Sequence, residues 1–237
     1  HNLNGFAPHP IVQSAEGITY LMDLARRESG GMLVGCSGTG GHANREVADA
    51  SDVILIHGNG CSRQRYYDLV QTVRAYGLGR PIVCNEDSPC VSRLSVAHHT
   101  RTSWGYYNNL TKQEPPADWS ITPGEDTFFA RRMAAGVGIE LPPLAPADQF
   151  YLQGFEPNIT VDGKRWVRLA SLVPETVDRV EYWRNGARVD TAYDEPFFVD
   201  YRTTWIQGPV IERGERAEWR AVAYLVDGSV VEKVARL

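Results

Sequence analysis

The chain has 237 residues, of which 43% are hydrophobic, and a formal net charge of −5. That length suits one large domain or two of ordinary size. The acidic balance argues against a nucleic-acid-binding protein, which would need a basic face or stripe. No apolar run reaches the length of a membrane span, so we expect none.

The N-terminal part begins with a loop, 1–13, that contains two prolines and has no clear periodicity. The apolar residues of Ile18–Arg27 recur on one helical face, which predicts a helix that ends at the glycine pair following Ser29. Met32–Ser37 then predicts a short buried strand. A processed end, an expression boundary and a truncation are all compatible with a start at His1, and the number of predicted strands favours truncation.

The glycine-rich loop Gly38–His42 follows that first strand. It lacks the Gly-Lys-Ser/Thr ending of a nucleotide-binding loop. We therefore expect it to allow a close backbone approach near a site, with an ordinary flexible loop as the alternative. His42 is a weaker candidate substrate-binding residue, and simple exposure of the loop to solvent explains it better.

A second strand is predicted over Val53–Ile56, and it runs directly into His57 and Asn59. Both side chains are candidates to bind substrate. A structural histidine at a strand end is the alternative for His57, and a left-handed turn between two glycines is the alternative for Asn59. A helix over Arg63–Tyr76 separates this strand from the next.

The third strand, Ile82–Asn85, is a short apolar run that ends in an amide and two carboxylates, Asn85, Glu86 and Asp87. Such a run, bounded by turn signals, is typical of a strand buried on both faces. Carboxylates at its end are costly to bury unless they have a partner or a task. Glu86 is therefore the first candidate for a catalytic group, and an acidic turn is the alternative.

A helix through Val96–Thr100 leads to a fourth strand over Thr102–Asn108, which contains the aromatic residues Trp104 and Tyr106. Alternating helices and short buried strands predict a parallel sheet flanked by helices. Four strands with polar ends are about half of a (β/α)8 barrel, in which active sites lie at the carboxyl ends of the strands.

The pattern changes in the C-terminal part. A closing helix is predicted around Phe128–Met133, and a proline-rich linker over 141–152 follows it. From 153 to 237 several short strands alternate with turns, including an Asn-Gly turn at Asn185, which is the strongest short hairpin signal. We therefore predict an α/β domain over 1–140 and an immunoglobulin-like β-sandwich over 153–237.

Three stretches of the first domain, SDVILIHGNG, RPIVCNEDSP and TSWGYYNN, resemble together the bacterial glycoside-hydrolase TIM barrels of clan A. The resemblance covers roughly residues 1–139. It implies that the strands are the fifth to the eighth of a barrel, and that the glutamate ending the seventh, Glu86, is the nucleophile of a retaining enzyme. It also implies that Trp104, at the end of the eighth strand, forms the floor of a sugar subsite.

In that family the acid/base carboxylate follows the fourth strand, usually in an Asn-Glu pair, and no such pair precedes Glu86 in this sequence. A retaining mechanism needs two carboxyl groups about 5–5.5 Å apart, so we expect the second one upstream of His1, in a missing N-terminal half-barrel of the same or a partner chain. Asn85, also a candidate to bind substrate, or a group on an adjacent strand would hold Glu86 by hydrogen bonds. His57 and Asn59 would bond sugar hydroxyls or orient Glu86. Asp87 would position the loop or bind a sugar hydroxyl, and Tyr106 would offer a flat face to the sugar.

The resemblance implies a hydrolase that acts on a poly- or oligosaccharide and needs no cofactor or metal ion. Together with the immunoglobulin-like module it also implies a secreted or periplasmic location. The alternative is a non-catalytic carbohydrate-binding or scaffold protein on a degenerate barrel. A complete four-stranded α/β domain is disfavoured, because its two open edges would expose unpaired backbone.

The four cysteines do not have the spacing of a metal site. Cys36 and Cys84 fall in predicted strands and would behave as small hydrophobic residues. Cys61 and Cys90 each follow a strand, so a disulfide between them is one alternative and two free thiols are the other.

Overall fold

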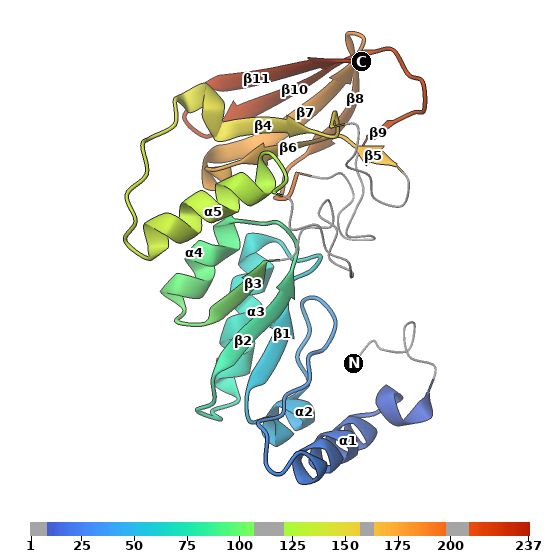
Figure 1. Ribbon diagram of the computed structural model, residues 1–237, viewed down its shortest axis with the longest axis vertical. Helices are drawn as coiled ribbons and strands as arrows, with labels where there is room; N and C mark the ends of the chain where they lie inside the picture. Colours follow the sequence, from blue (N-terminus) through green and yellow to red (C-terminus); the bar gives the residue numbers. More distant parts are fainter. Residues whose placement is uncertain (1–8, 107–120, 157–163, 198–208) are drawn as a thin grey trace. The chain divides into compact units, whose positions relative to one another are not determined.

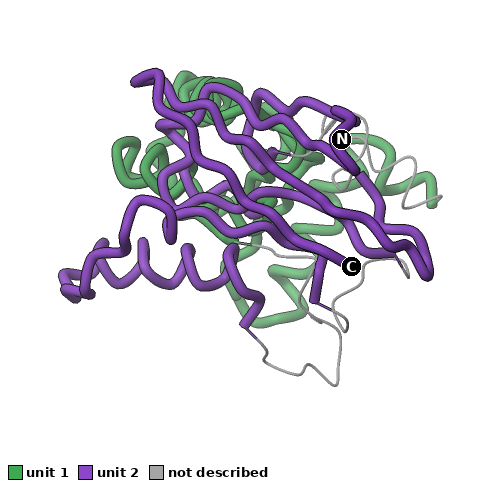
Figure 2. Tube along the Cα trace, turned by 90° about the horizontal axis from the view of Figure 1, so that it is seen from above, with its two compact units in different colours: residues 1–88, 93–107 green, residues 89–92, 108–237 purple. Residues whose placement is uncertain are grey.

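The structure is a computed structural model that describes residues 9–106, 121–156, 164–197 and 209–237. The chain divides into two units (Figure 2): residues 1–88 and 93–107 form unit 1, and residues 89–92 and 108–237 form unit 2. No helix in the described ranges is long and apolar enough to cross a membrane. The domain limits predicted at 140 and 153 stay predictions.

The elements follow one another as shown in Figure 1. Up to Tyr106 they are η2 (Pro10–Gln13), α1 (Ala15–Glu28), α2 (Arg45–Ala50), β1 (Ile54–His57), α3 (Arg63–Ala75), β2 (Ile82–Asp87), α4 (Ser92–His99) and β3 (Ser103–Tyr106). From Glu125 onward they are α5 (Glu125–Gly136), η3 (Pro146–Gln149), β4 (Phe150–Gln153), β5 (Arg165–Trp166), β6 (Arg168–Ser171), η4 (Pro174–Thr176), β7 (Val177–Arg184), β8 (Ala187–Ala192), β9 (Val210–Ile211), β10 (Glu218–Leu225) and β11 (Val230–Arg236).

The first three strands form a parallel sheet in the order β1-β2-β3. Its main core lies between the sheet and α3, whose buried face matches the helical period of the sequence. The residues of this core include Ile54, Ile56, Tyr66, Leu69, Val70, Val73 and Cys84. Because the three strands are parallel, their carboxyl ends meet at one edge of the sheet.

The strand predicted over Met32–Ser37 is wrong, so this sheet has three strands and not four. The segment has no regular secondary structure, and Asp52 N–H donates to the carbonyl of Val34 at 2.8 Å. The Val34 N–H, however, donates to the side-chain carboxylate of Asp52 at 2.9 Å, and Arg26 binds the same carboxylate. A side chain thus takes the place of a strand ladder.

Short polar residues begin the helices of this region. The side chains of Ser14, Asn44 and Ser62 accept backbone N–H groups in the first turns of α1, α2 and α3. The six-residue helix α2 was not predicted. Arg80 donates to the carbonyls of Ala48 and Ser51 at its C-terminal end, at 2.9 and 2.5 Å, which places a cation where the helix dipole favours one.

The second part of the chain contains antiparallel sheets. The largest has the order β11-β10-β7-β8, and β4-β6 and β5-β9 form two-stranded sheets. The hairpin at Asn185 is confirmed: Asn185 and Gly186 have φ of 50° and 79°, as the Asn-Gly turn requires. β4 begins at Phe150, three residues before the predicted all-β region.

One core joins the four-stranded sheet to the β4-β6 pair. Phe150 and Leu152 of β4 and Leu169 of β6 pack in the same cluster as Tyr182 and Trp219. Two sheets sharing one apolar core is the arrangement of a β-sandwich.

A charged network is buried in unit 2, next to this core. Arg168 Nη2 lies 3.2 Å from Glu125 Oε1, and both side chains are almost fully buried. Arg168 Nε also donates to Gln153 Oε1 at 2.7 Å. Burial raises the pKa of Glu125 to about 8, against the opposing effect of Arg168.

All four cysteines are free thiols, so the disulfide considered between Cys61 and Cys90 is not formed. Cys84 is buried in β2, as predicted. Cys36 is only partly buried, and it lies in a segment without regular secondary structure and not in a strand.

Candidate active site

The candidate site lies where the carboxyl ends of the three parallel strands meet. In the sheet register His57 of β1 is opposite Glu86 of β2, and Asp87 of β2 is opposite Tyr106 of β3. The candidate residues at the ends of these strands therefore lie next to one another, at the carboxyl end of the sheet.

Strand β2 contains one more residue than its neighbours at this edge. On the β1 side Ile56 pairs with Cys84 and His57 with Glu86, which leaves Asn85 without an opposite residue. On the β3 side two residues of β2, between Cys84 and Asp87, lie opposite the single residue Gly105. A β-bulge of this kind changes the direction of the side chains that follow it, and bulges are frequent next to active sites.

The carboxylate of Glu86 has a direct amide donor. Asn59 Nδ2 donates to Glu86 Oε1 at 2.6 Å, which is short for such a bond. The Glu86 side chain retains 42% of its accessible surface, so a ligand can reach it. Asn59, which we expected to orient Glu86 or to bond a sugar hydroxyl, makes this contact, whereas Asn85 is exposed.

His57 lies beside the same carboxylate. Its Nε2 is 3.8 Å from Glu86 Oε2, beyond hydrogen-bond distance. This nitrogen is buried and has no hydrogen-bond partner among the described residues. A buried, unpartnered ring nitrogen next to an accessible carboxylate suits a group that binds a ligand hydroxyl.

Two contacts hold Asn59 in place. Ser88 Oγ donates to Asn59 Oδ1 at 3.1 Å, on the opposite end of the amide from Glu86. The glycine-rich loop packs on its backbone: a Cβ at Gly40 would lie 1.9 Å from the Asn59 carbonyl oxygen. Gly41 N–H also donates to the His57 carbonyl at 2.9 Å. The loop thus makes the close backbone approach that we expected from its glycines.

Asp87 is fully buried and forms an ion pair with Arg93, which is also buried. Its carboxylate further accepts the Trp104 indole N–H at 2.7 Å and the Ser88 N–H at 2.7 Å. Burial raises the pKa of Asp87, and these three donors oppose the rise. With no exposed surface, Asp87 suits the positioning role that we considered for it and not contact with a sugar hydroxyl.

Arg93 connects Asp87 to the loop that carries Asn59. Its guanidinium donates to the carbonyl of Gly58 at 2.8 Å and also to the carbonyl of Cys61. These two carbonyls flank Asn59 and Gly60 in the sequence. The buried pair therefore joins the end of β2 to the turn that follows β1.

The aromatic residues of β3 lie next to each other. The rings of Trp104 and Tyr106 are 5.8 Å apart and meet edge to face at 66°. Trp104 is partly buried against the core between the sheet and α3. Its indole nitrogen is bound to Asp87, so its orientation is set from inside the unit.

His42 is exposed, and its Nε2 lies 3.5 Å from Arg65 Nη2. It does not join the hydrogen bonds that connect Ser88, Asn59 and Glu86.

Sequence reasoning missed two residues of this arrangement, Ser88 and Arg93. A signal for Arg93 exists in retrospect: a carboxylate in the buried position of Asp87 needs a cation, and Arg93 is the first arginine or lysine after it. No comparable signal points to Ser88, because its contact depends on where the turn after β1 lies.

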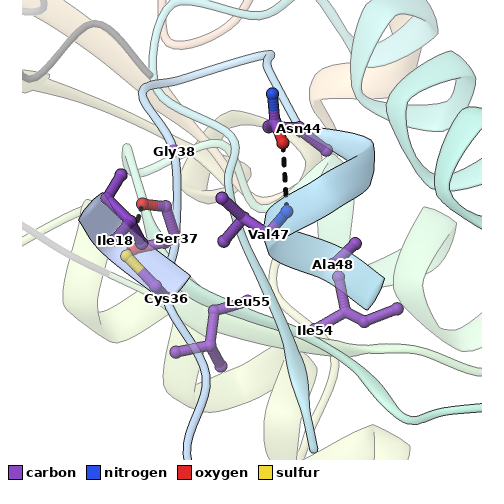
Figure 3. Close-up of a pocket in the computed structure, with 10 residues that line it drawn as sticks. Ile18, Cys36, Ser37, Gly38, Asn44, Val47, Ala48, Ile54 and Leu55 are labelled. Carbon is purple, nitrogen blue, oxygen red and sulfur yellow. Dashed lines mark hydrogen bonds between the residues drawn. The ribbon is translucent and has the colours of Figure 1, made fainter. Parts of the chain in front are cut away.

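A separate hollow, shown in Figure 3, is lined by apolar side chains that include Ile18, Val47 and Ile54. Its amide, Asn44, is occupied in capping α2, because Oδ1 accepts the Val47 N–H at 3.0 Å. Ile18 and Val47 belong to one small apolar core. The hollow is therefore explained as packing between α1, α2 and β1.

No family model and no curated protein matches this chain. Among solved structures it is similar to a Bacteroides uniformis β-glucuronidase, with 10% identity and a TM-score of 0.41 over 96% of this chain and 31% of that one. It is similar to a Parabacteroides merdae β-glucuronidase, with 12% identity and a TM-score of 0.37 over 95% of this chain and 33% of that one. The Clostridium perfringens spore cortex lytic enzyme SleM aligns with 11% identity and a TM-score of 0.23, over 81% of this chain and 92% of that one.

Two of these three structures are bacterial β-glucuronidases, and the chain spans about a third of the length of each. With TM-scores below 0.5, these similarities do not decide the fold or the activity.

Proposed function

We propose that the chain is the C-terminal part of a retaining glycoside hydrolase that acts on a poly- or oligosaccharide, with Glu86 as the nucleophile. One observation carries the proposal: an accessible carboxylate at the carboxyl end of the central parallel strand is held by an amide donor at 2.6 Å. Residues 1–140 would supply the last three strands of a (β/α)8 barrel, with β1, β2 and β3 as its sixth, seventh and eighth. Residues 153–237 would form an immunoglobulin-like module after the linker 141–152.

In the first step, Glu86 Oε2 would attack the anomeric carbon while Asn59 holds Oε1. The glycosidic C–O bond breaks, its electron pair stays on the leaving oxygen, and the acid/base carboxyl group protonates that oxygen. In the second step, the same carboxyl group takes a proton from water, which attacks the anomeric carbon and releases Glu86. His57 Nε2 would bind a sugar hydroxyl, and Trp104 and Tyr106 would contact the sugar ring.

The second carboxyl group is the open part of this mechanism. Asp87 is next to Glu86 in the sequence, but it is fully buried and paired with Arg93, so it is unsuited to protonate a leaving group. Our proposal therefore takes the acid/base residue from a preceding half-barrel, in the same or a partner chain. A secreted or periplasmic location is part of the same proposal, because such enzymes meet large polysaccharides there.

The test uses substrates that do not depend on the acid/base residue. Dinitrophenyl 2-deoxy-2-fluoroglycosides carry a leaving group that departs without protonation, and their fluorine slows release of the glycosyl-enzyme. A panel of such sugars would be incubated with the chain, followed by intact-mass measurement and peptide mapping. We expect one fluoroglycosyl group on the peptide that contains Glu86.

The Glu86→Gln variant should stay unlabelled, because the amide cannot act as the nucleophile. The matched control is Glu28→Gln, an exposed glutamate at the end of α1, which should be labelled like the unmodified chain. Absence of labelling across the panel, or labelling at another carboxylate, would overturn the proposal. Binding of a sugar without labelling would favour the non-catalytic carbohydrate-binding protein instead.

A further inference from the structure

We propose that Ser88 is a positioning residue for Glu86 and acts through the side-chain amide of Asn59. The inference rests on the proposed function and deepens it, because it assigns a task to a fully buried residue that was not predicted from the sequence. It rests on a chain of two hydrogen bonds, from Ser88 Oγ to Asn59 Oδ1 and from Asn59 Nδ2 to Glu86 Oε1.

The two ends of the Asn59 amide are chemically different. Nδ2 donates and stabilises the negative charge of Glu86, whereas Oδ1 in the same place would repel it. The Ser88 hydroxyl donates to Oδ1 and so holds the oxygen away from Glu86. Two donors that follow one another in this way also polarise each other, which strengthens the bond that reaches the carboxylate.

Ser88 is itself well placed for this task. It is fully buried, so water does not compete for its hydroxyl. Its backbone N–H donates to Asp87 Oδ1 at 2.7 Å. Asp87 is held by Arg93, whose guanidinium also binds the turn on both sides of Asn59. The hydroxyl donor, Ser88, and the amide that accepts from it, Asn59, are thus both held by the same buried ion pair of Asp87 and Arg93.

The experiment follows the Asn59 side-chain amide by ¹H–¹⁵N NMR in the full chain and needs no turnover. Asn59→Asp identifies the signals by their disappearance. In Ser88→Ala we expect the Asn59 Nδ2 protons to shift in the direction seen in Glu86→Gln. We also expect them to exchange with water at least ~3-fold faster, because one hydrogen bond of the chain is lost.

The matched control is Ser51→Ala. Ser51 is another buried serine of unit 1, and its hydroxyl donates to the Val47 carbonyl at 2.7 Å, within α2 and its cap. This variant loses a buried hydroxyl but should leave the Asn59 signals unchanged. If Ser88→Ala leaves them unchanged as well, the proposal is overturned, whatever the variant does to stability.

A second measurement is the rate at which the fluoroglycosides label Glu86. Ser88→Ala should slow it ~3- to 10-fold, the equivalent of one hydrogen bond, without weakening binding of the sugar. If the unmodified protein is labelled and Ser88→Ala is labelled at the same rate, the positioning role of Ser88 is overturned. If the unmodified chain is not labelled at all, the proposed function fails, and the NMR result alone then decides whether Ser88 positions Glu86.

Discussion

Arg93 and Asp87 form an ion pair from which solvent is excluded on both sides, since their side chains expose 1% and 0% of their surface. Asp87 directly follows the accessible Glu86 in β2, and the Arg93 guanidinium also binds two backbone carbonyls of the neighbouring turn. Two charges buried at a strand end are costly unless each satisfies the other. Removing one partner should therefore lower the free energy of unfolding strongly, because it leaves the other charge buried and unpaired.

Arg93→Met keeps an unbranched, flexible side chain, though a shorter one, and removes its charge and hydrogen bonds. We expect the free energy of unfolding to fall by ~3–5 kcal/mol, because Asp87 is then buried without a cation. Urea denaturation measures the change. The double variant Arg93→Met/Asp87→Asn should cost less than the sum of the two single variants, since it leaves neither charge unpaired. A loss below ~1 kcal/mol in the single variant would contradict the structure.

Gly58→Ala tests how closely the end of β1 approaches the carboxylate of Asp87. A Cβ at Gly58 would lie 2.3–2.5 Å from the three carboxyl atoms of Asp87, so the pair must move. We expect a loss of ~1–3 kcal/mol in thermal or urea unfolding. Gly136→Ala is the control, because a Cβ there meets nothing within 4 Å at the end of α5. Equal stabilities for the two variants would disprove the predicted clash.

The raised pKa of Glu125 leads us to expect that stability depends on pH. Burial raises its pKa to about 8, so between the usual pKa of a glutamate and this value the folded chain binds more protons than the unfolded chain. Stability should therefore fall as pH rises through this window, and should level off above it.

Glu125→Gln should remove that dependence, so that its stability relative to the unmodified chain rises by roughly 2–4 kcal/mol between pH 5 and pH 9. Chemical denaturation at each pH measures the difference. Glu140→Gln, at an exposed glutamate, should follow the curve of the unmodified chain. A constant difference between Glu125→Gln and the unmodified chain would argue that Glu125 keeps an ordinary pKa beside Arg168.

The different burial of the four thiols leads us to expect that a thiol reagent modifies them at different rates. Burial raises the pKa of Cys36, Cys61 and Cys84, the last to about 11, which lowers their thiolate fraction at neutral pH. Cys36 is the most accessible of the four, so a thiol reagent should modify it first, and Cys36→Ser should remove this fast phase. In denaturant without reductant all four should react. Two reactive thiols instead of four would show a disulfide.

Much of the local structure could be predicted from the sequence, because its signals are local. The apolar period of α1 and its glycine stop, the short apolar run of β2 and the Asn185 turn each depend on residues a few positions apart. The strand predicted over Met32–Ser37 failed for the opposite reason. The carboxylate that replaces its ladder belongs to Asp52, 18 residues beyond Val34.

The sequence could predict which strand ends come together at the candidate site, but not the contacts between their side chains. Alternating strands and helices indicate a parallel sheet, so His57 and Glu86 were expected at one edge. Only the tertiary structure decided that Asn59 is the donor to Glu86, that Asp87 turns inward and that Ser88 lies behind Asn59. The physical reason is the bulge in β2 together with the turn after β1: one added residue redirects the side chains, and no local pattern in the sequence specifies that register.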